Sequence, residues 1–372
     1  MGKRIRIVYG LTDFIVGGMQ RQFSEQLRFF DRSKFDIILV TLSQHPGKAE
    51  LYDALPKDLA VHKLNFKGIK DIRSWWQLYR LLRALDPDIV VSSIFFANTV
   101  FRVLKPFVGY LSIPREHNTY VDKPKFHQWV DKILSYVSYR IATVSKSVAE
   151  FTAEQEGIPI EKFAPLTNGI DVVKAQTLMK ELPDKASLKT ELGYNEGDVL
   201  LLNMARLVAQ KNHDVLIDGF NEFHKSHPEY KLAIVGAGGL QEKLQKQIET
   251  QGLGDCVKLF GIRNDVWRFY KAADVFVSAA GIEGLSNAEL EALTAGLPLV
   301  STRTSGTDEL LIEGENGYFI EGFAAHDVAS ALEEMANAPR DTFSNRSLEH
   351  VKDFDIRVTV DTYSKLFIEA AS

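Results

Sequence analysis

Two glutamates separated by seven residues, Glu283 and Glu291, carry the strongest chemical signal in this sequence. Between them, Ser286 and Glu289 have the spacing of a capping box, which predicts a helix that begins at about Asn287. The backbone N–H groups at the start of such a helix bind anions. The capping box explains Glu289, whereas Glu291 shares its helical face with small alanines and needs a polar partner, such as a pair of hydroxyl groups. Solvated glutamates are the plain alternative.

Two cations, Arg206 and Lys211, follow the strand predicted at 199–205. At the carboxyl end of a parallel strand they would lie where ligands bind in open α/β sheets. There they would neutralise a diphosphate and stabilise it as a leaving group. A solvated basic turn is the alternative for this segment.

Glycines follow two of the predicted strands. Gly17 and Gly18 are adjacent, follow the strand at 5–9 and open a helix, so the backbone can approach a ligand closely there. The segment Gly-Ala-Gly-Gly at 236–239 is typical of a tight turn between a strand and a helix. Neither segment matches the dinucleotide fingerprint G-x-G-x-x-G, which argues against an NAD-dependent oxidoreductase.

His117 lies in Pro-Arg-Glu-His-Asn, residues 114–118, which we expect to form a loop at the cleft between two domains. A structural role is the alternative for a lone histidine. Asp86-Pro-Asp88 has the spacing of a metal-binding pair, but it precedes a predicted strand and is interpreted as a turn. No cluster of His, Cys and Asp has metal-ligand spacing, so we expect neither a metal nor another cofactor.

Short β-branched runs alternate with helical patterns along the chain. Strands are predicted at 5–9, 35–41, 61–64, 89–92 and 140–144, and then at 199–205, 232–235, 257–260, 275–278 and 299–301. Such alternation indicates parallel sheets covered by helices, and its repetition predicts an α/β fold of two facing Rossmann-like domains with an inter-domain cleft. We expect an N-terminal domain at 1–168, a C-terminal domain at 169–355, and a terminal helix at 356–372 that packs back onto the first domain.

Charge is unevenly distributed along the 372 residues. Residues 1–170 carry 24 Lys and Arg against 17 Asp and Glu, a balance of +7, and the remainder carries 20 against 32, a balance of −12. The sole cysteine, Cys256, excludes an internal disulfide framework and fits a reducing, cytoplasmic compartment. No apolar run approaches the ~18 residues needed to span a bilayer.

In combination these segments resemble the retaining glycosyltransferase family 4, which has the GT-B fold. The matching motifs are Thr-Val-Ser at 143–145, Thr-Asn-Gly-Ile-Asp at 167–171, the Arg206 and Lys211 segment, Ala-Ile-Val-Gly at 233–236, and the stretch from Glu283 to Pro298. The sequence departs from the family pattern at Gly-Ala-Gly-Gly, where Gly-x-Gly-Pro is commoner, and at Leu285, where an aromatic residue is frequent. These departures leave the donor preference open.

The resemblance implies a nucleotide-sugar donor site and a role for each matching residue. The implied catalytic residues are Arg206 and Lys211 at the diphosphate, Glu283 at the transferred sugar, and His117 near the reacting sugar. The implied donor-binding residues are Gly17 and Gly18 at the phosphates, Gly261, Ile262 and Arg263 at the base, Gly284, Leu285 and Ser286 at the sugar and phosphate, and Glu291 at the ribose.

The sequence therefore predicts a retaining hexosyltransferase that moves a sugar from a nucleoside diphosphate to a glycan or lipid-linked acceptor. Such chemistry occurs in bacterial polysaccharide and lipopolysaccharide biosynthesis. Because cations and helix N-termini stabilise the leaving group, no metal is required. The alternatives are a non-catalytic nucleotide-sugar-binding subunit and a GT-B-fold nucleotide-sugar epimerase.

The basic N-terminal half is expected to bind the acceptor. It carries two basic and aromatic patches, which we interpret as a seat on an anionic membrane surface, peripheral at the inner face, rather than as a nucleic-acid site. The alternative is that the apolar stripe of the first patch is part of the core. The first patch consists of Phe126, Trp129, Ile133, Tyr136 and Val137 beside Lys125, Lys132 and Arg140, and the second of Lys67, Lys70, Arg73, Trp75 and Trp76.

Overall fold

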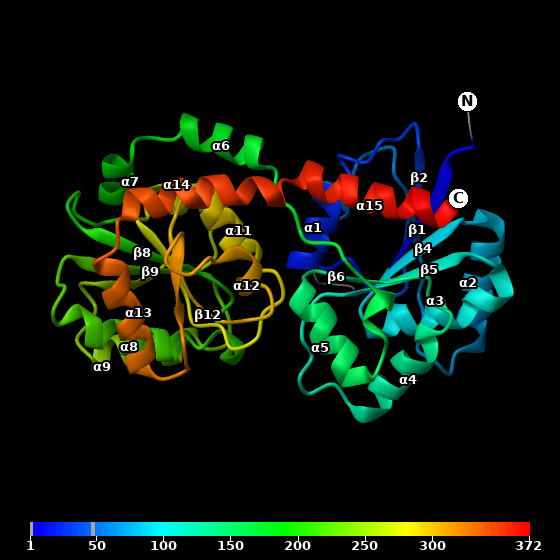
Figure 1. Ribbon diagram of the computed structural model, residues 1–372, viewed down its shortest axis with the longest axis horizontal. Helices are drawn as coiled ribbons and strands as arrows, with labels where there is room; N and C mark the ends of the chain where they lie inside the picture. The colour runs from blue at the N-terminus through cyan, green and yellow to red at the C-terminus, as the bar shows by residue number, and fades with distance from the viewer. Residues whose placement is uncertain (1–2, 46–48) are drawn as a thin grey trace. The chain divides into compact units, whose positions relative to one another are not determined.

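The computed structural model describes residues 3–45 and 49–372 (Figure 1). The chain forms two compact units. The first comprises residues 1–169 and 356–372, and the second comprises residues 170–355. The predicted fold class of two Rossmann-like α/β units is confirmed, because each unit contains one parallel sheet covered by helices.

Seven strands form the sheet of the first unit in the part of the chain that the structure describes, in the order β3-β2-β1-β4-β5-β6-β7. All neighbouring strands are parallel. The strands are β1 (Ile5–Leu11), β2 (Phe35–Thr41), β3 (Ala60–Lys63), β4 (Ile89–Ser93), β5 (Leu111–Glu116), β6 (Ile141–Thr143) and β7 (Phe163–Pro165).

Helices cover both faces of this sheet, and each face has its own apolar cluster. On one face, the C-terminal helix packs against β1 and β4 (Figure 1). The ring of Tyr363 contacts that of Phe30, and the ring of Phe367 contacts that of Phe35. This burial explains why the last residues of the chain belong to the first unit. The helices are α1 (Gly18–Gln26), η1 (Tyr52–Ala54), α2 (Ile72–Leu85), α3 (Phe95–Val108), α4 (Lys125–Ser135), α5 (Lys146–Glu156), η2 (Ile160–Lys162) and α15 (Ile356–Ala371).

The second unit, all of whose residues are described, has a six-stranded sheet in the order β10-β9-β8-β11-β12-β13. Its strands are β8 (Val199–Met204), β9 (Tyr230–Val235), β10 (Val257–Leu259), β11 (Val275–Ser278), β12 (Leu299–Thr302) and β13 (Gly317–Ile320). Its helices are α6 (Val172–Glu181), α7 (Lys185–Glu191), η3 (Ala209–Lys211), α8 (His213–His224), α9 (Gln241–Thr250), α10 (Val266–Ala272), α11 (Asn287–Thr294), α12 (Thr307–Leu310), α13 (Ala325–Ala336), α14 (Arg340–His350) and η4 (Val351–Phe354).

Every strand predicted from the sequence corresponds to a strand of the structure, but the prediction missed β5, β7 and β13. The segment Pro114–Glu116, which was expected in a loop, forms the end of β5 and pairs with β4 and β6. Proline and adjacent charges are typical of loops, and the sheet overrides that preference here because the arginine and the glutamate are both buried.

Candidate active site

Arg206 and Lys211 follow β8 in the second unit, as predicted. β8 and β11 are parallel neighbours, so the loops after them meet at one edge of the sheet. Gln210 joins these loops: its Nε2 donates to the carbonyl of Ile282 at 2.8 Å, and its own carbonyl accepts from the N–H of Gly281 at 3.0 Å. The predicted cations and Glu283 therefore lie on segments that are tied together.

Lys211 and Glu283 form an ion pair, with side chains 14% and 26% exposed. Burial lowers the pKa of Lys211 to about 8, Glu289 opposes this shift and Arg206 adds to it. Arg206 is exposed, and its guanidinium has no hydrogen bond or ion pair with any residue that the structure describes. This edge of the sheet thus carries one unpaired cation, Arg206, and one cation bound to a carboxylate, Lys211.

Helix α11 begins at Asn287, as predicted, and the Ser286 side chain accepts from the N–H of Glu289 at 3.4 Å. The backbone half of the predicted capping box is therefore present, but the prediction that the Glu289 side chain completes it is wrong. The Glu289 carboxylate is buried and accepts from Ser301 Oγ at 2.6 Å and from Thr307 Oγ1 at 3.4 Å. Burial raises the pKa of Glu289, and the hydroxyl of Ser301, the charge of Lys211 and the hydroxyl of Thr307 oppose the shift.

Glu291 has a protein partner, which the sequence did not reveal. The hydroxyl of Tyr270 donates to Glu291 Oε2 at 2.7 Å and also contacts the carbonyl of Ala288 at 3.2 Å. Burial, and then the charge of Glu291, raise the pKa of Tyr270 well above its ordinary value, so the hydroxyl keeps its proton. Tyr270 therefore fixes the orientation of a carboxylate that is only partly buried.

The backbone at Gly284 lies directly against Gly306. A Cβ atom at Gly306 would lie 2.1 Å from the carbonyl oxygen of Gly284 and 2.5 Å from the Cα of Leu285. Leu285 is itself buried, and Ser286 caps α11. Glycine at 306 thus allows the segment before α11 to pack closely against the loop after β12.

The predicted base-binding residues follow β10. Gly261 has φ +66, in the left-handed region, and its carbonyl accepts from the N–H of Gly236 at 2.9 Å. Ile262 is 78% exposed. Arg263 forms two hydrogen bonds with Asp265, at 2.8 and 2.7 Å, so its guanidinium already has a carboxylate partner.

In the first unit, Gly17 is the N-cap of α1 and Gly18 its first residue, just beyond β1. A Cβ atom at Gly17 would lie 2.6 Å from Gln20 Oε1, and the preceding N–H of Val16 donates to Ala49 at 3.0 Å. The predicted glycine turn is therefore present beyond the carboxyl end of β1, an interior strand of the sheet.

His117 directly follows β5. Its Nε2 is buried and has no hydrogen-bond partner among the described residues. Burial, and then the charge of Arg115, lower the pKa of His117 well below its ordinary value. The imidazole is therefore neutral near pH 7, suited to a hydrogen bond or a contact with a hydroxyl and not to an ion pair.

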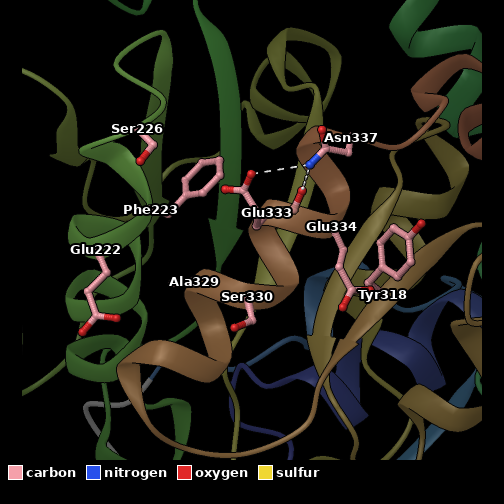
Figure 2. A pocket seen from close by; sticks show the side chains of 9 residues that line it. All are labelled: Glu222, Phe223, Ser226, Tyr318, Ala329, Ser330, Glu333, Glu334 and Asn337. Atoms are coloured by element: carbon pink, nitrogen blue, oxygen red, sulfur yellow. Dashed lines mark hydrogen bonds between the residues drawn. The ribbon is translucent and has the colours of Figure 1, made fainter.

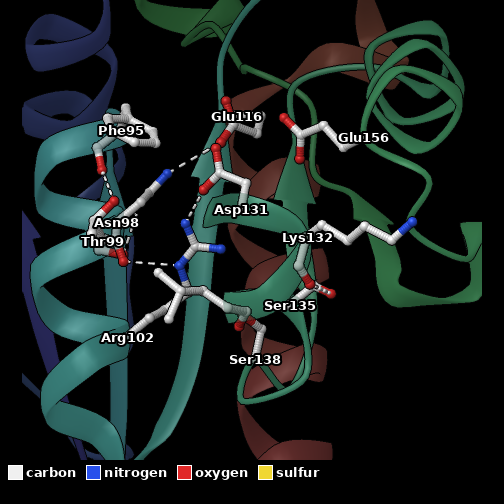
Figure 3. A network of polar contacts seen from close by, with 12 residues as sticks. Phe95, Asn98, Thr99, Arg102, Glu116, Asp131, Lys132, Ser135, Ser138 and Glu156 are labelled. Carbon is white, nitrogen blue, oxygen red and sulfur yellow. Dashed lines mark hydrogen bonds and ion pairs between the residues drawn. The ribbon is translucent and has the colours of Figure 1, made fainter. Parts of the chain in front are cut away.

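A buried charged network includes Glu116, the residue that precedes this histidine in the sequence (Figure 3). Asn98 donates to Glu116 at 3.3 Å, and Arg102 is paired with Asp131. Lys123, on the loop after His117, lies 2.6 Å from Asp131 and 4.0 Å from Glu116, and it also contacts Glu156. Three acidic side chains and two basic ones are therefore buried together, joining β5 to α3, α4 and α5.

The network determines which face of α4 is buried. The inward residues of this helix are polar, namely Gln128, Asp131 and Ser135. The apolar residues of the first predicted patch are instead exposed: Phe126 by 66%, Trp129 by 58%, Ile133 by 44% and Tyr136 by 79%. The alternative that this stripe belongs to the core is thus wrong.

A hollow of the second unit lies away from the predicted residues. It has a volume of about 640 Å³, lies beside α8 and α13, and is lined by none of the predicted site residues (Figure 2). It is lined by Glu222, Phe223, Ser226, Tyr318, Ala329, Ser330, Glu333, Glu334 and Asn337.

Within residues 3–45 and 49–372 there is no group of three or more His, Cys, Asp or Glu that could hold a metal ion. In the same residues, no helix is long and apolar enough to cross a membrane.

Several glycosyltransferases are similar to this chain, some over nearly its whole length and others over about half of it. A UDP-Gal:alpha-D-GlcNAc-diphosphoundecaprenol alpha-1,3-galactosyltransferase of Escherichia coli is 24% identical, covering 98% of this chain and 97% of the relative. A lipopolysaccharide core biosynthesis glycosyltransferase, LpsE of Rhizobium meliloti, is 30% identical over 45% of this chain and 49% of its own length. Among solved structures, HepE of Anabaena in complex with UDP has a TM-score of 0.86 at 17% identity, covering 98% of this chain and 100% of that one.

A glycosyltransferase from Rickettsia africae also has a TM-score of 0.86, at 14% identity, with 99% of each chain covered. These likenesses agree with the two-unit GT-B fold. The model of Glycosyltransferase Family 4 matches residues 16–174, and that of Glycosyl transferases group 1 matches residues 184–349. Because the two models span most of the chain in this order, the protein belongs to the GT-B glycosyltransferases of family 4.

Proposed function

We propose that the second unit binds a nucleoside diphosphate sugar and that the protein transfers its sugar with retention of configuration. The observation that carries this proposal is the meeting of Arg206, the Lys211–Glu283 pair and the N-terminus of α11 at one sheet edge. Two cations and a helix N-terminus suit a diphosphate leaving group, and carboxylates suit sugar hydroxyls. The solved complexes of HepE with UDP and with UDP-glucose support a uridine nucleotide as the first donor to test.

In this proposal each charged residue has a separate task. Arg206 and Lys211 bind the diphosphate, Glu283 binds the transferred hexose, and Glu291, oriented by Tyr270, binds the ribose. Lys211 then exchanges its carboxylate partner for phosphate as Glu283 turns to the sugar. Gly17, Gly18 and His117 of the first unit contribute backbone and a neutral imidazole.

The chemical step that we propose is a same-face displacement. The bond between the anomeric carbon and the diphosphate breaks, the acceptor oxygen bonds to the same face of that carbon, and the departing phosphate takes the acceptor proton. Arg206, Lys211 and the α11 N-terminus supply the positive charge that the leaving diphosphate requires, so we propose that no metal takes part.

The test begins with a thermal-shift screen against nucleotide sugars, followed by transfer assays with the best donor. Glu283→Ala and Lys211→Ala should each nearly abolish transfer while leaving the fold intact. Lys243→Ala, which removes only an exposed pair with Asp214, is the matched control and should behave as wild type. Wild-type turnover in either of the first two variants would refute the assignment. Donor binding without transfer to any acceptor would favour a non-catalytic subunit, and release of an epimerised nucleotide sugar would favour the epimerase.

We further propose that the acceptor is lipid-linked and that α4 seats the first unit on an anionic membrane at its cytoplasmic face. The Escherichia coli relative, by its name, acts on a diphosphoundecaprenol-linked sugar. The outward aromatic residues of α4 lie beside Lys125 and Lys132, a combination typical of helices that lie in the interface of a bilayer. The second patch adds Trp76, 59% exposed, whereas Trp75 packs on Phe66 and donates to a backbone carbonyl.

Vesicle flotation tests the membrane proposal. The wild type should bind vesicles that contain anionic lipid more strongly than neutral ones, and Phe126→Ser with Trp129→Ser should bind weakly to both. Phe323→Ser is the control, because Phe323 is 57% exposed but lies in the second unit. Binding that is independent of anionic lipid, or unchanged in the double variant, would remove the proposal.

A further inference from the structure

Arg115, the next-to-last residue of β5, has a buried guanidinium that no described residue neutralises. Its residue exposure is 2%, and its Nη2 has no hydrogen-bond partner within residues 3–45 and 49–372. Arg102 is equally buried but is bound by Asp131, whereas Arg115 forms no ion pair in the same described part of the chain. A buried charge without an ion-pair partner is costly, so an anion from outside the chain would stabilise Arg115.

The groups around Arg115 are neutral and able to donate hydrogen bonds. Its guanidinium carbon lies 5.3 Å from the centroid of the Tyr363 ring, and Ser93 is its register neighbour on β4. The hydroxyls of Tyr363, Ser93 and Tyr9 are all buried and have no partner among the described residues. Burial raises the pKa of Tyr9 and of Tyr363, so both keep their protons near pH 7.

The helices that cover this face of the sheet supply further unpaired polar atoms. Gln26 of α1 and Thr359 of α15 are buried, and the amide of the first and the hydroxyl of the second have no described partner. The amide of Gln26 and the hydroxyl of Thr359 are neutral hydrogen-bond donors, and they lie in the interior between α1, α15 and the sheet. The chemistry of this interior is therefore complementary to an anion.

We propose that the first unit binds a small inorganic anion at Arg115, with the hydroxyls of Tyr9, Ser93 and Tyr363 as additional donors. The 2% exposure of Arg115 favours an ion the size of chloride or phosphate over a phosphate ester with a bulky substituent. Because the charge of Arg115 also acts on His117, a bound anion would weaken that influence and raise the pKa of the histidine. This site goes beyond the donor chemistry of the second unit, and its test needs no transfer assay.

The test compares wild type with Arg115→Met by thermal unfolding of the full chain at constant ionic strength, with gluconate replaced stepwise by chloride, bromide or phosphate. The wild type should be stabilised by about 5 °C or more at an anion concentration about 100-fold above Kd. Arg115→Met should lose this dependence. Arg140→Met is the matched control, because Arg140 lies 5.4 Å from the Tyr139 ring but is only partly buried, and it should respond as the wild type does.

Crystals of the full chain soaked in bromide locate the ion independently of any phosphate that binds at Arg206 and Lys211. An anomalous peak within hydrogen-bond distance of the Arg115 guanidinium supports the proposal, and the response to chloride against phosphate identifies the ion. The absence of such a peak would overturn it. A second result would also overturn the proposal, namely that Arg115→Met is more stable than the wild type by the same amount in gluconate, chloride, bromide and phosphate. That result is expected when the substitution only removes an unpaired charge.

Discussion

Replacing Glu156 by glutamine should remove a pH dependence from the stability of the first unit. Burial raises the pKa of Glu156 from 4.5 to about 7, and Lys123 only partly opposes the shift. Between these values the folded protein holds the proton more tightly than the unfolded chain, so stability falls as pH rises. The contribution is complete below pH 4.5 and is lost by about pH 7. A shift of about 2.5 units corresponds to about 3 kcal/mol.

The Glu156→Gln variant mimics the protonated acid, and Lys123 keeps Asp131 at 2.6 Å and Glu116 at 4.0 Å. Urea unfolding from pH 5 to pH 8, followed by fluorescence, measures the difference. The signal reports mainly on the first unit, which contains Trp75, Trp76 and Trp129, whereas Trp267 is in the second.

Relative to the variant, the wild type should lose up to about 3 kcal/mol across this range. Glu154→Gln, an exposed position on the same helix, should retain the wild-type slope. Equal slopes in the wild type and Glu156→Gln would refute the reasoning, because the buried carboxyl would then have an ordinary pKa.

Three further predictions concern the candidate site. Tyr270→Phe removes the hydrogen bond to Glu291 and should weaken donor binding by about 1 kcal/mol, or about fivefold in Kd, as measured by calorimetry; an unchanged Kd would show that this orientation is unimportant. Gly306→Ala places a Cβ atom 2.1 Å from the carbonyl oxygen of Gly284 and should destabilise the second unit by about 1–3 kcal/mol in thermal unfolding, whereas Gly254→Ala, with nothing within 4 Å, should be close to neutral. Burial and the charge of Arg115 lower the pKa of His117, so the imidazole should not titrate near pH 6.5. The profiles of kcat/KM against pH for the wild type and for His117→Gln should therefore have the same shape near pH 6.5, and a step that only the wild type shows would contradict this prediction.

The sequence was sufficient for the two-sheet fold and for the prediction that several candidate site residues lie at one sheet edge. Alternation of buried strands and amphipathic helices is a local property, so it predicted ten strands to within two residues at each end. The positions of Arg206 and Lys211 followed from the rule that ligands bind at the carboxyl ends of parallel strands, and that of Glu283 from the helix start predicted at Asn287. β5 was missed because the charges of Arg115 and Glu116 are typical of exposed segments, although both are buried here.

Contacts between residues that are distant in the sequence could not be predicted from it. Glu289 has a local explanation at the start of α11, yet its carboxylate is held by Ser301 and Thr307, which belong to later elements. Tyr270 reaches Glu291 from α10, with no sequence spacing to suggest the contact. Such pairings arise when the sheet brings separate loops to one edge.

The sequence by itself determined where most strands form, ten of the thirteen, and which loops carry charge, because hydrophobic periodicity and turn residues act over a few neighbours. Only the tertiary structure decided which face of α4 is buried. The aromatic stripe of that helix is typical of a core, but Asp131 is bound by Arg102 and Lys123, and a buried charge is more expensive to leave unpaired than an aromatic ring is to expose. Polar partners far away in the chain therefore turned the apolar face of α4 outward.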